Sequence, residues 1–268
     1  MDLFKFLSYG FMQRAVIAGS FIAALCAILG VFLVLRRFSL IGDGLAHVTF
    51  GSLAVGLFFN ITPLYIALPL VVLSSLGIMK LTEAQHMYGD AAIGIVSALG
   101  IAIGVLLVSV TKGFNIDLFS YLFGNILAIS QTEVAITIAL SVSVIVVIAL
   151  FYQDLVAVTF DEECAQAEGI NTKAINKVLV ILTAVTVVLA MKVVGIMLVS
   201  ALLILPTVTA LQIAKGFKMT ILLAVIAAVV SVWIGIMLSF FLDWPSGATI
   251  VLVSFVLLFC AFSYRKIR

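Results

Sequence analysis

The stretch RRFSLIGDGLAH, residues 36–47, decides how the rest of this chain is interpreted. Two arginines close one apolar segment, and an aspartate and a histidine then lie inside the next one. If the residues from 40 onward form a helix, Asp43 and His47 are four positions apart and share one face. A carboxylate oxygen and an imidazole nitrogen are both ligands that zinc and related metals accept. Polar groups inside a membrane usually mark a pathway, so this pair is a candidate metal site.

The composition places the chain in a membrane. Of its 268 residues, 65% are hydrophobic and 10% are charged, whereas about a quarter of the residues of a soluble domain are charged. So few polar side chains cannot cover a water-facing surface. We therefore expect an all-α, polytopic membrane protein that forms a single transmembrane domain over residues 1–268.

The apolar segments predict the number of membrane crossings. A helix needs about 20 apolar residues to cross a bilayer, and the pattern predicts eight or nine such spans, with nine favoured. The count is open because residues 176–205 could form one long, tilted segment instead of two spans. The nine predicted spans are 13–35, 40–59, 63–80, 91–110, 131–152, 176–191, 193–214, 219–241 and 246–264.

Basic residues predict the orientation, because short cytoplasmic loops carry an excess of Lys and Arg. We expect the N-terminus outside and the C-terminus in the cytoplasm, which requires an odd number of spans. The basic residues on the inner side are then Arg36, Arg37, Lys80, Lys173, Lys177, Lys215, Lys218, Arg265, Lys266 and Arg268. Those on the outer side are Lys5, Arg14, Lys112 and Lys192.

One substantial polar segment separates the spans, and we expect residues 153–176 to form a cytoplasmic loop. Within it, Asp161 suits a helix N-cap and is followed by acidic residues in the first turn. Gly169 could end that helix in the left-handed conformation. The pattern predicts a short acidic helix between two spans, and a solvated loop without a docking role is the alternative.

Glycines are placed where helices could approach one another closely. Gly100 and Gly104 in the predicted fourth span form a small-xxx-small pair of the kind that packs membrane helices. Gly44 and Gly51 thin the predicted second span around the aspartate and histidine.

Two other segments carry local expectations. Pro206 should kink the seventh span and free carbonyls that the hydroxyls of Thr207 and Thr209 could bond. Residues 114–125 are amphipathic and too short to cross, so we expect them at the outer surface of the membrane, with a re-entrant segment as the alternative.

Taken together, these features resemble the permease subunit of bacterial zinc/manganese ABC importers. The similarity runs in order over nearly the whole chain. It rests on the strings LRRFSLIGDGLAH (35–47), YGDAAIGIVSALG (88–100), DLFSYLFGNILAIS (117–130), DEECAQAEGI (161–170) and VVGIMLVSALLILPTVTA (193–210).

The resemblance implies the partners of the chain. They are a second copy of the permease, a cytoplasmic ABC ATPase subunit, an extracellular metal-binding protein and the lipid of the cell membrane, but no nucleic acid. Zn²⁺ or Mn²⁺ would be the transported ion, with no permanently bound cofactor. Nothing in the sequence matches the ATP-binding pattern GxxxxGK[ST], so we expect ATP hydrolysis on the partner and no enzymatic activity here.

The resemblance also implies roles for individual residues. Asp43 and His47 match an aspartate and a histidine that contribute to the metal site of the family. Lys192 departs from that picture, because a cation near the outer end of a pathway could repel metal unless it extends to the headgroups. The family's coupling helix, which docks into a groove of the ATPase, maps onto Asp161, Glu162, Ala165, Ala167, Glu168 and Gly169.

Other functions remain open on the residues alone. Asp43 and His47 could form a buried ion pair that only fixes packing. Asp43 and Asp90 could serve an intramembrane aspartyl protease, although Asp90 begins a span and His47 then has no task. An ion-driven secondary carrier would normally need more protonatable groups within its spans. Between the two metals, the stretch LRRFSLIGDGLAHVTFG favours zinc, with manganese as the alternative.

Overall fold

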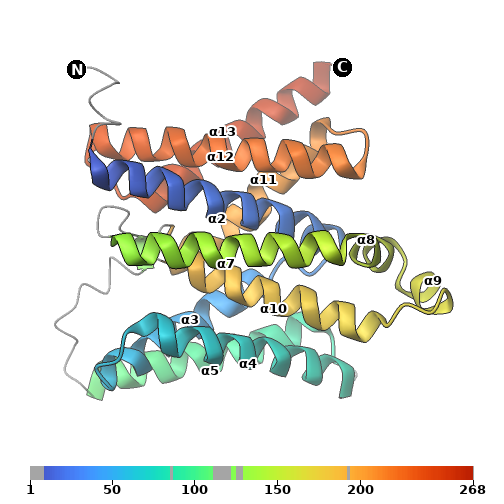
Figure 1. Ribbon diagram of the computed structural model, residues 1–268, viewed down its shortest axis with the longest axis horizontal. Coiled ribbons are helices and arrows are strands. Elements are labelled where there is room, and N and C mark those ends of the chain that lie inside the picture. The colour runs from blue at the N-terminus through green and yellow to red at the C-terminus, as the bar shows by residue number, and fades with distance from the viewer. Residues whose placement is uncertain (1–8, 85–86, 111–121, 125–128, 192–193, 268) are drawn as a thin grey trace.

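The computed structural model describes residues 9–84, 87–110, 122–124, 129–191 and 194–267, and within them the chain folds into helices that lie side by side (Figure 1). This confirms the all-α prediction. In chain order the helices are α2 (Gly10–Leu35), α3 (Ile41–Phe58), α4 (Pro63–Ala84), α5 (Gly89–Val110), α7 (Gln131–Leu150), α8 (Tyr152–Phe160), α9 (Glu162–Ala167), α10 (Thr172–Ala190), the 3₁₀ turn η2 (Ile196–Leu198), α11 (Val199–Ile213), α12 (Phe217–Leu242) and α13 (Ser246–Ile267).

Eight of the described helices are long and apolar enough to cross a membrane, namely α2, α3, α4, α5, α7, α10, α12 and α13. Many of these helices carry apolar side chains on the surface that faces out of the bundle as well as on the surface that faces its core. Leu99 and Leu106 of α5 are exposed, as are Leu222 and Trp233 of α12. A helix that is hydrophobic on every side belongs in a membrane or a buried core, so these outer faces suit lipid or another membrane helix.

The seventh predicted span, residues 193–214, corresponds to η2 and α11, and it also runs along the bundle. It starts beside the beginning of α13, where a Cβ on Gly247 would overlap the carbonyl oxygen of Val194. It ends beside the end of α13, where Arg265 donates to Gln212 Oε1 at 2.6 Å. The described residues therefore contain eight helices long enough to cross a membrane and one shorter apolar helix, α11, that lies along the same bundle. Both predicted counts, eight and nine, are compatible with this arrangement.

The alternative of one continuous helix over 176–205 is wrong. Helix α10 ends at Ala190. Gly195 then adopts a φ of 90°, a backbone conformation that residues other than glycine rarely adopt. Helix α11 has 15 residues, which is about 22 Å, so it is shorter than the hydrocarbon layer it is expected to cross. Lys192 lies outside the described residues.

Helices α8 and α9 project at one end of the bundle, on the right in Figure 1, and we call this the α9 end. The ring of Phe217, at the start of α12, packs there against Phe32, Tyr152 and Phe160 with centroids 5.4, 6.2 and 5.6 Å away. The segment predicted as a loop, 153–176, is thus mostly helical and comprises α8, α9 and the first turn of α10. Of the surface segment expected at 114–125, the structure describes only Leu122–Gly124.

Helix α3 crosses α5 at contact distance because both are thinned by glycine. A Cβ on Gly100 would lie 2.7 Å from Val48 Cα and 2.9 Å from the carbonyl oxygen of His47. A Cβ on Gly51 would overlap the carbonyl of Gly100. Real Cβ atoms do not approach so closely, so the crossing depends on the absence of side chains at these positions.

Buried hydroxyl groups in the bundle are mostly bonded within their own helix. Each donates to the carbonyl four residues earlier, as the Ser and Thr side chains of membrane helices commonly do. The buried examples include Thr49 to Leu45, Ser52 to Val48, Thr183 to Leu179, Thr186 to Leu182, Thr209 to Leu205 and Ser254 to Ile250, at 2.7–3.0 Å.

Candidate functional site

Asp43 and His47 lie on one face of α3, as their spacing predicts. Asp43 Oδ2 is 3.5 Å from His47 Nε2. The Asp43 side chain is 52% exposed and that of His47 22%, so the pair is open to one side of the protomer. The other ring nitrogen, His47 Nδ1, is buried and has no hydrogen-bond partner.

The pair lies in the half of α3 that is nearer the α9 end. Asp43 belongs to the first turn of α3 and His47 to the next, which places them about 3 and 9 Å along the helix axis from Ile41. The positive end of the helix dipole stabilises a carboxylate in that first turn. The Asp43 carboxylate therefore lies at the favourable end of the helix dipole as well as next to an imidazole.

In the part of the chain that the structure describes, one protomer offers only these two candidate ligands at the pair. Among the described residues, no group of three or more His, Cys, Asp and Glu side chains is close enough to hold a metal. A site with two protein ligands is incomplete, because metal sites of this ligand type normally have three or four.

Gly44 and Gly51 of α3 contact α5, in agreement with the close helix approach predicted from the sequence. A Cβ on Gly44 would meet the side chain of Ile93, and Gly51 faces Gly100, so both glycines pack α3 against α5. Gly104 lies along the same contact, where a Cβ would be 2.6 Å from the ring of Phe50. They support the two ligands indirectly, by fixing the helix that carries them.

Pro206 is buried inside α11, as expected, but the predicted hydroxyl bonding is different. Proline has no N–H to donate to the carbonyl of Leu202, four residues earlier. The hydroxyls of Thr207 and Thr209 bond instead to Leu203 and Leu205, at 3.2 and 2.7 Å. The threonines therefore do not replace the hydrogen bond that the proline removes.

The predicted capping of α9 is confirmed at both ends. The Asp161 carboxylate accepts from the backbone N–H of Cys164 at 2.9 Å, the bond expected of an N-cap. This hydrogen bond lowers the pKa of Asp161 from its ordinary value. At the other end Gly169 has a φ of 91°, in the left-handed region.

One residue of the predicted coupling set, Ala165, does not face outward, and another, Glu162, is bonded within the chain. Ala165 is 2% exposed and packs inside the protomer, whereas Ala167 and Glu168 are exposed. Glu162 is bonded within the chain on both carboxylate oxygens, to Arg36 at 3.2 Å and to Asn176 at 2.8 Å. A partner that approaches α9 can therefore reach Ala167 and Glu168, whereas Ala165 is covered.

Cys164 gives a chemical test of the cap. Its exposed thiol has a pKa raised mainly by the nearby charge of Asp161. Replacement Asp161→Asn removes that charge and keeps a side chain that caps helices well. The pKa of Cys164 should fall, and more of the reactive thiolate should be present near neutral pH.

We therefore expect a water-soluble alkylating reagent to modify Cys164 faster in Asp161→Asn than in the parent. The measurement is labelling rate by mass spectrometry, in a Cys26→Ser, Cys260→Ser background. Glu168→Gln is the matched control and should raise the rate less, because Glu168 is the weaker electrostatic cause. An unchanged rate in Asp161→Asn would mean that the charge of Asp161 does not act on the Cys164 thiol.

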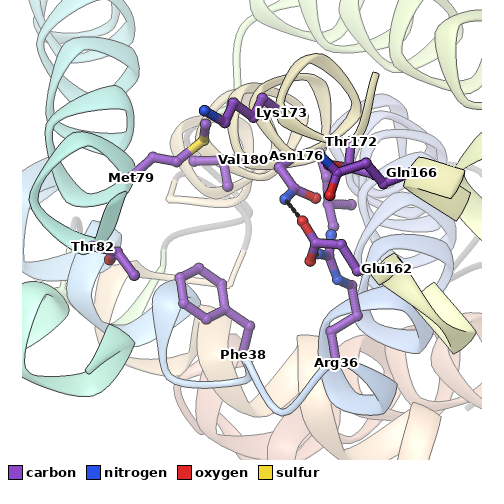
Figure 2. Close-up of a pocket in the computed structure, with 11 residues that line it drawn as sticks. Arg36, Phe38, Met79, Thr82, Glu162, Gln166, Thr172, Lys173, Asn176 and Val180 are labelled. Carbon is purple, nitrogen blue, oxygen red and sulfur yellow. Dashed lines mark hydrogen bonds and ion pairs between the residues drawn. The ribbon is translucent and has the colours of Figure 1, made fainter. Parts of the chain in front are cut away.

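A cavity of about 410 Å³ adjoins α9, and Figure 2 shows the side chains around it. This cavity could not be predicted from the sequence, because its wall comes from separate parts of the chain. Arg36 and Phe38 follow α2, Met79 and Thr82 belong to α4, and further lining residues are Glu162, Gln166, Thr172, Lys173, Asn176, Leu179 and Val180.

A bundle of apolar helices with a polar pair inside one of them and a short capped helix at one end is the architecture of a multi-pass transport protein. Comparison with known proteins agrees. Residues 8–265 match the model of the ABC 3 transport family, and the chain belongs to this family. It is the membrane-spanning subunit of an ABC transporter and lies in the cell membrane.

Individual relatives cover the chain almost end to end. The manganese transport system membrane protein MntC of Halalkalibacterium halodurans is 34% identical over 260 residues, 97% of this chain and 89% of that protein. The high-affinity zinc uptake system membrane protein ZnuB of Haemophilus influenzae is 33% identical over 243 residues, which are 90% of this chain and 92% of that protein.

Among solved structures, PsaBC from Streptococcus pneumoniae in complex with Fab superposes with a TM-score of 0.84 at 29% identity. The match covers 97% of this chain and 95% of that one. These matches confirm the resemblance to permeases of metal ABC importers.

Proposed function

We propose that this chain is the permease of an ATP-driven importer of divalent transition metals, with zinc as the favoured cargo. The observation that carries the proposal is the Asp43–His47 pair, which places one carboxylate and one imidazole on the open face of a membrane helix. Charged and titratable groups in such helices are costly to bury and usually belong to an ion pathway.

The separation of the pair suits a shared metal ion. Two ligand atoms that each lie about 2.0–2.1 Å from a tetrahedral zinc are about 3.4 Å apart. The observed Oδ2 to Nε2 distance is 3.5 Å. An ion could therefore be held by both side chains with almost no rearrangement of α3.

The incomplete ligand set favours a second copy of the permease. Two ligands hold a metal weakly, which suits a protein that must release its cargo. A symmetric pair of permeases that faced one another across Asp43 and His47 would offer four ligands along one pathway. The exposed apolar face of α5, next to α3, is available for such a partner.

Basic residues support an orientation with the α9 end in the cytoplasm. Of the basic residues that the structure describes, all but Arg14 lie at or near the α9 end. An excess of Lys and Arg on one side is typical of the cytoplasmic face. In this orientation metal arrives at the opposite end from an extracellular binding protein, and α9 meets a separate ATPase subunit.

Exposed residues of α9 test the contact with the ATPase. We expect Ala167→Trp to weaken copurification of the ATPase subunit with the permease, because a large ring would replace a small side chain at the exposed end of α9. Glu163→Gln should be mild, since exposed charges mainly affect encounter rates and contribute little affinity. The measurement is the yield of ATPase after affinity purification through the permease.

The same replacement at Ala165, which the resemblance also assigns to the coupling helix, would act differently. Ala165 is buried, so a tryptophan there would first displace α9 from its own protomer. If Ala167→Trp leaves copurification unchanged, α9 is not the docking surface, and the segment between α4 and α5 becomes the candidate.

The choice between zinc and manganese depends on the ligands. Imidazole and carboxylate accept both ions, but the Irving–Williams order places zinc above manganese at the same site. The test is uptake of radiolabelled zinc and manganese, separately and in competition, by vesicles that contain permease, ATPase and binding protein. Manganese uptake that zinc does not inhibit would overturn zinc as the cargo, and absence of uptake of either ion would overturn the proposal.

A further inference from the structure

Glu162 occupies an unusual position for the first residue of an exposed helix. Its Oε2 accepts from Arg36 Nη2 at 3.2 Å, and its Oε1 accepts from Asn176 Nδ2 at 2.8 Å. Figure 2 shows the carboxylate between the two partners. Because Arg36 follows α2 and Asn176 belongs to α10, one side chain joins α9 to two membrane helices.

Arg36, one of the two partners of Glu162, is more buried than an ordinary surface arginine. Its side chain is 16% exposed, against 47% for Glu162. Burial lowers the pKa of the guanidinium, and the charge of Glu162 acts against that shift. Without Glu162, a largely buried cation would lose its counterion, which is more costly than the loss of a pair in full contact with water.

The arginine stands at the start of a tightly bonded turn that leads to α3. The N–H of Arg37, whose φ is 56°, donates to Val34 O at 3.1 Å, and the N–H of Phe38 donates to Leu33 O at 2.9 Å. The carbonyl of Phe38 then accepts from Ile41, the first residue of α3. The backbone between Arg36 and α3 is therefore held as a compact unit.

The same turn also touches α5. The ring of Phe38 lies over Gly89, the first residue of α5, where a Cβ would be 2.7 Å from the ring. A displacement of the turn would therefore also move the first residues of α3 and α5. Asp43 follows only two residues after α3 begins, so its carboxylate would move with the turn.

We propose that Arg36 and Glu162 are positioning residues for transport, and that their ion pair passes movement of α9 to the metal-binding end of α3. The inference rests on the proposed function, in which α9 contacts the ATPase and Asp43 binds metal. It adds the physical link between these two sites: Glu162 of α9, Arg36, the turn through Phe38, and Asp43. Neither residue needs to touch the metal or the ATPase.

The experiment separates coupling from assembly in the complete transporter, reconstituted with its ATPase and binding protein. Glu162→Gln and Arg36→Gln each remove one charge. We expect both variants to copurify with the ATPase as the parent does, and metal uptake to fall by about tenfold, within the usual range of coupling between two sites. ATP hydrolysis should persist but lose its dependence on the metal-loaded binding protein.

Two controls make the result specific to the pair. Glu163→Gln removes a neighbouring carboxylate from the same first turn of α9, and it should leave uptake and stimulation near the parent values. The charge reversals Arg36→Glu and Glu162→Arg should each abolish uptake when made alone. The double variant that carries both, which restores a pair of opposite charges, should recover at least part of that uptake. Size-exclusion profiles verify that every variant is folded.

The outcomes decide between three conclusions. Uptake near the parent level in both single variants, or a double charge reversal no better than its single changes, would overturn the link. Loss of ATPase copurification in Glu162→Gln would show that the residue serves docking, which also overturns it. Failure of the proposed function is distinguishable, because the unmodified complex would then show neither uptake nor hydrolysis stimulated by metal-loaded binding protein.

Discussion

Replacement of Asp43 or His47 by alanine is expected to reduce metal uptake to background while the permease still assembles with its ATPase. Each change removes one of the two ligands that a protomer offers at this place. Neither side chain supports the core of the bundle, since Asp43 is exposed and His47 is partly exposed. Folding should therefore survive, and the loss should be confined to transport.

The measurement is uptake of radiolabelled metal by reconstituted complexes with equal ATPase content. Asp90→Ala is the matched control, because Asp90 is an exposed aspartate in the first turn of another membrane helix, α5. Metal uptake by the Asp90→Ala complex should remain close to that of the parent. If Asp43→Ala and His47→Ala transport metal as the parent does, the pair is a packing feature and the ligand assignment is wrong.

Replacement of Gly100 by alanine is expected to have the second large effect. The added methyl group would lie 2.7 Å from Val48 Cα and 2.9 Å from the carbonyl of His47, so the backbones of α3 and α5 would have to separate. Overpacking of this kind typically costs about 1–3 kcal/mol. The apparent unfolding temperature in detergent should fall, and uptake should fall with it because the displaced turn carries His47.

Gly94→Ala provides the control within the same helix. A Cβ at Gly94 meets nothing within 4 Å, so the change keeps every contact. Alanine favours the helical conformation over glycine by up to about 1 kcal/mol, so this variant should unfold at the same temperature as the parent or a higher one. Equal unfolding temperatures for Gly100→Ala and Gly94→Ala would show that the crossing relaxes without cost.

Local features of the structure could be predicted from the sequence. The spacing of Asp43 and His47 places them on one face of any regular helix, whatever surrounds it. The caps of α9 at Asp161 and Gly169 depend on the chemistry of those residues and their immediate neighbours. The spans followed from composition, since long apolar segments in this chain have few alternatives to membrane helices.

Contacts between distant segments could not be predicted in the same way. The sequence suggested that Gly44 and Gly51 allow a close helix approach, but the partner of a glycine depends on which helix packs there, and that is α5. Ala165 was expected to face a partner protein, and the bundle buries it. The ion pair of Glu162 could not be predicted because Arg36, its counterion, is far away in the chain.

The hydroxyl groups of the bundle have a consequence for how the protein is made. A membrane helix leaves the translocon before most of its neighbours have been synthesised, and a polar group without a partner opposes its transfer into lipid. Thr49, Ser52, Thr183 and Thr186 each find their acceptor one turn earlier in the same helix. Asp43 and His47 also lie next to each other within a single helix. Each of these segments can therefore enter the bilayer before its neighbours arrive, so biogenesis of the subunit need not wait for the complete bundle.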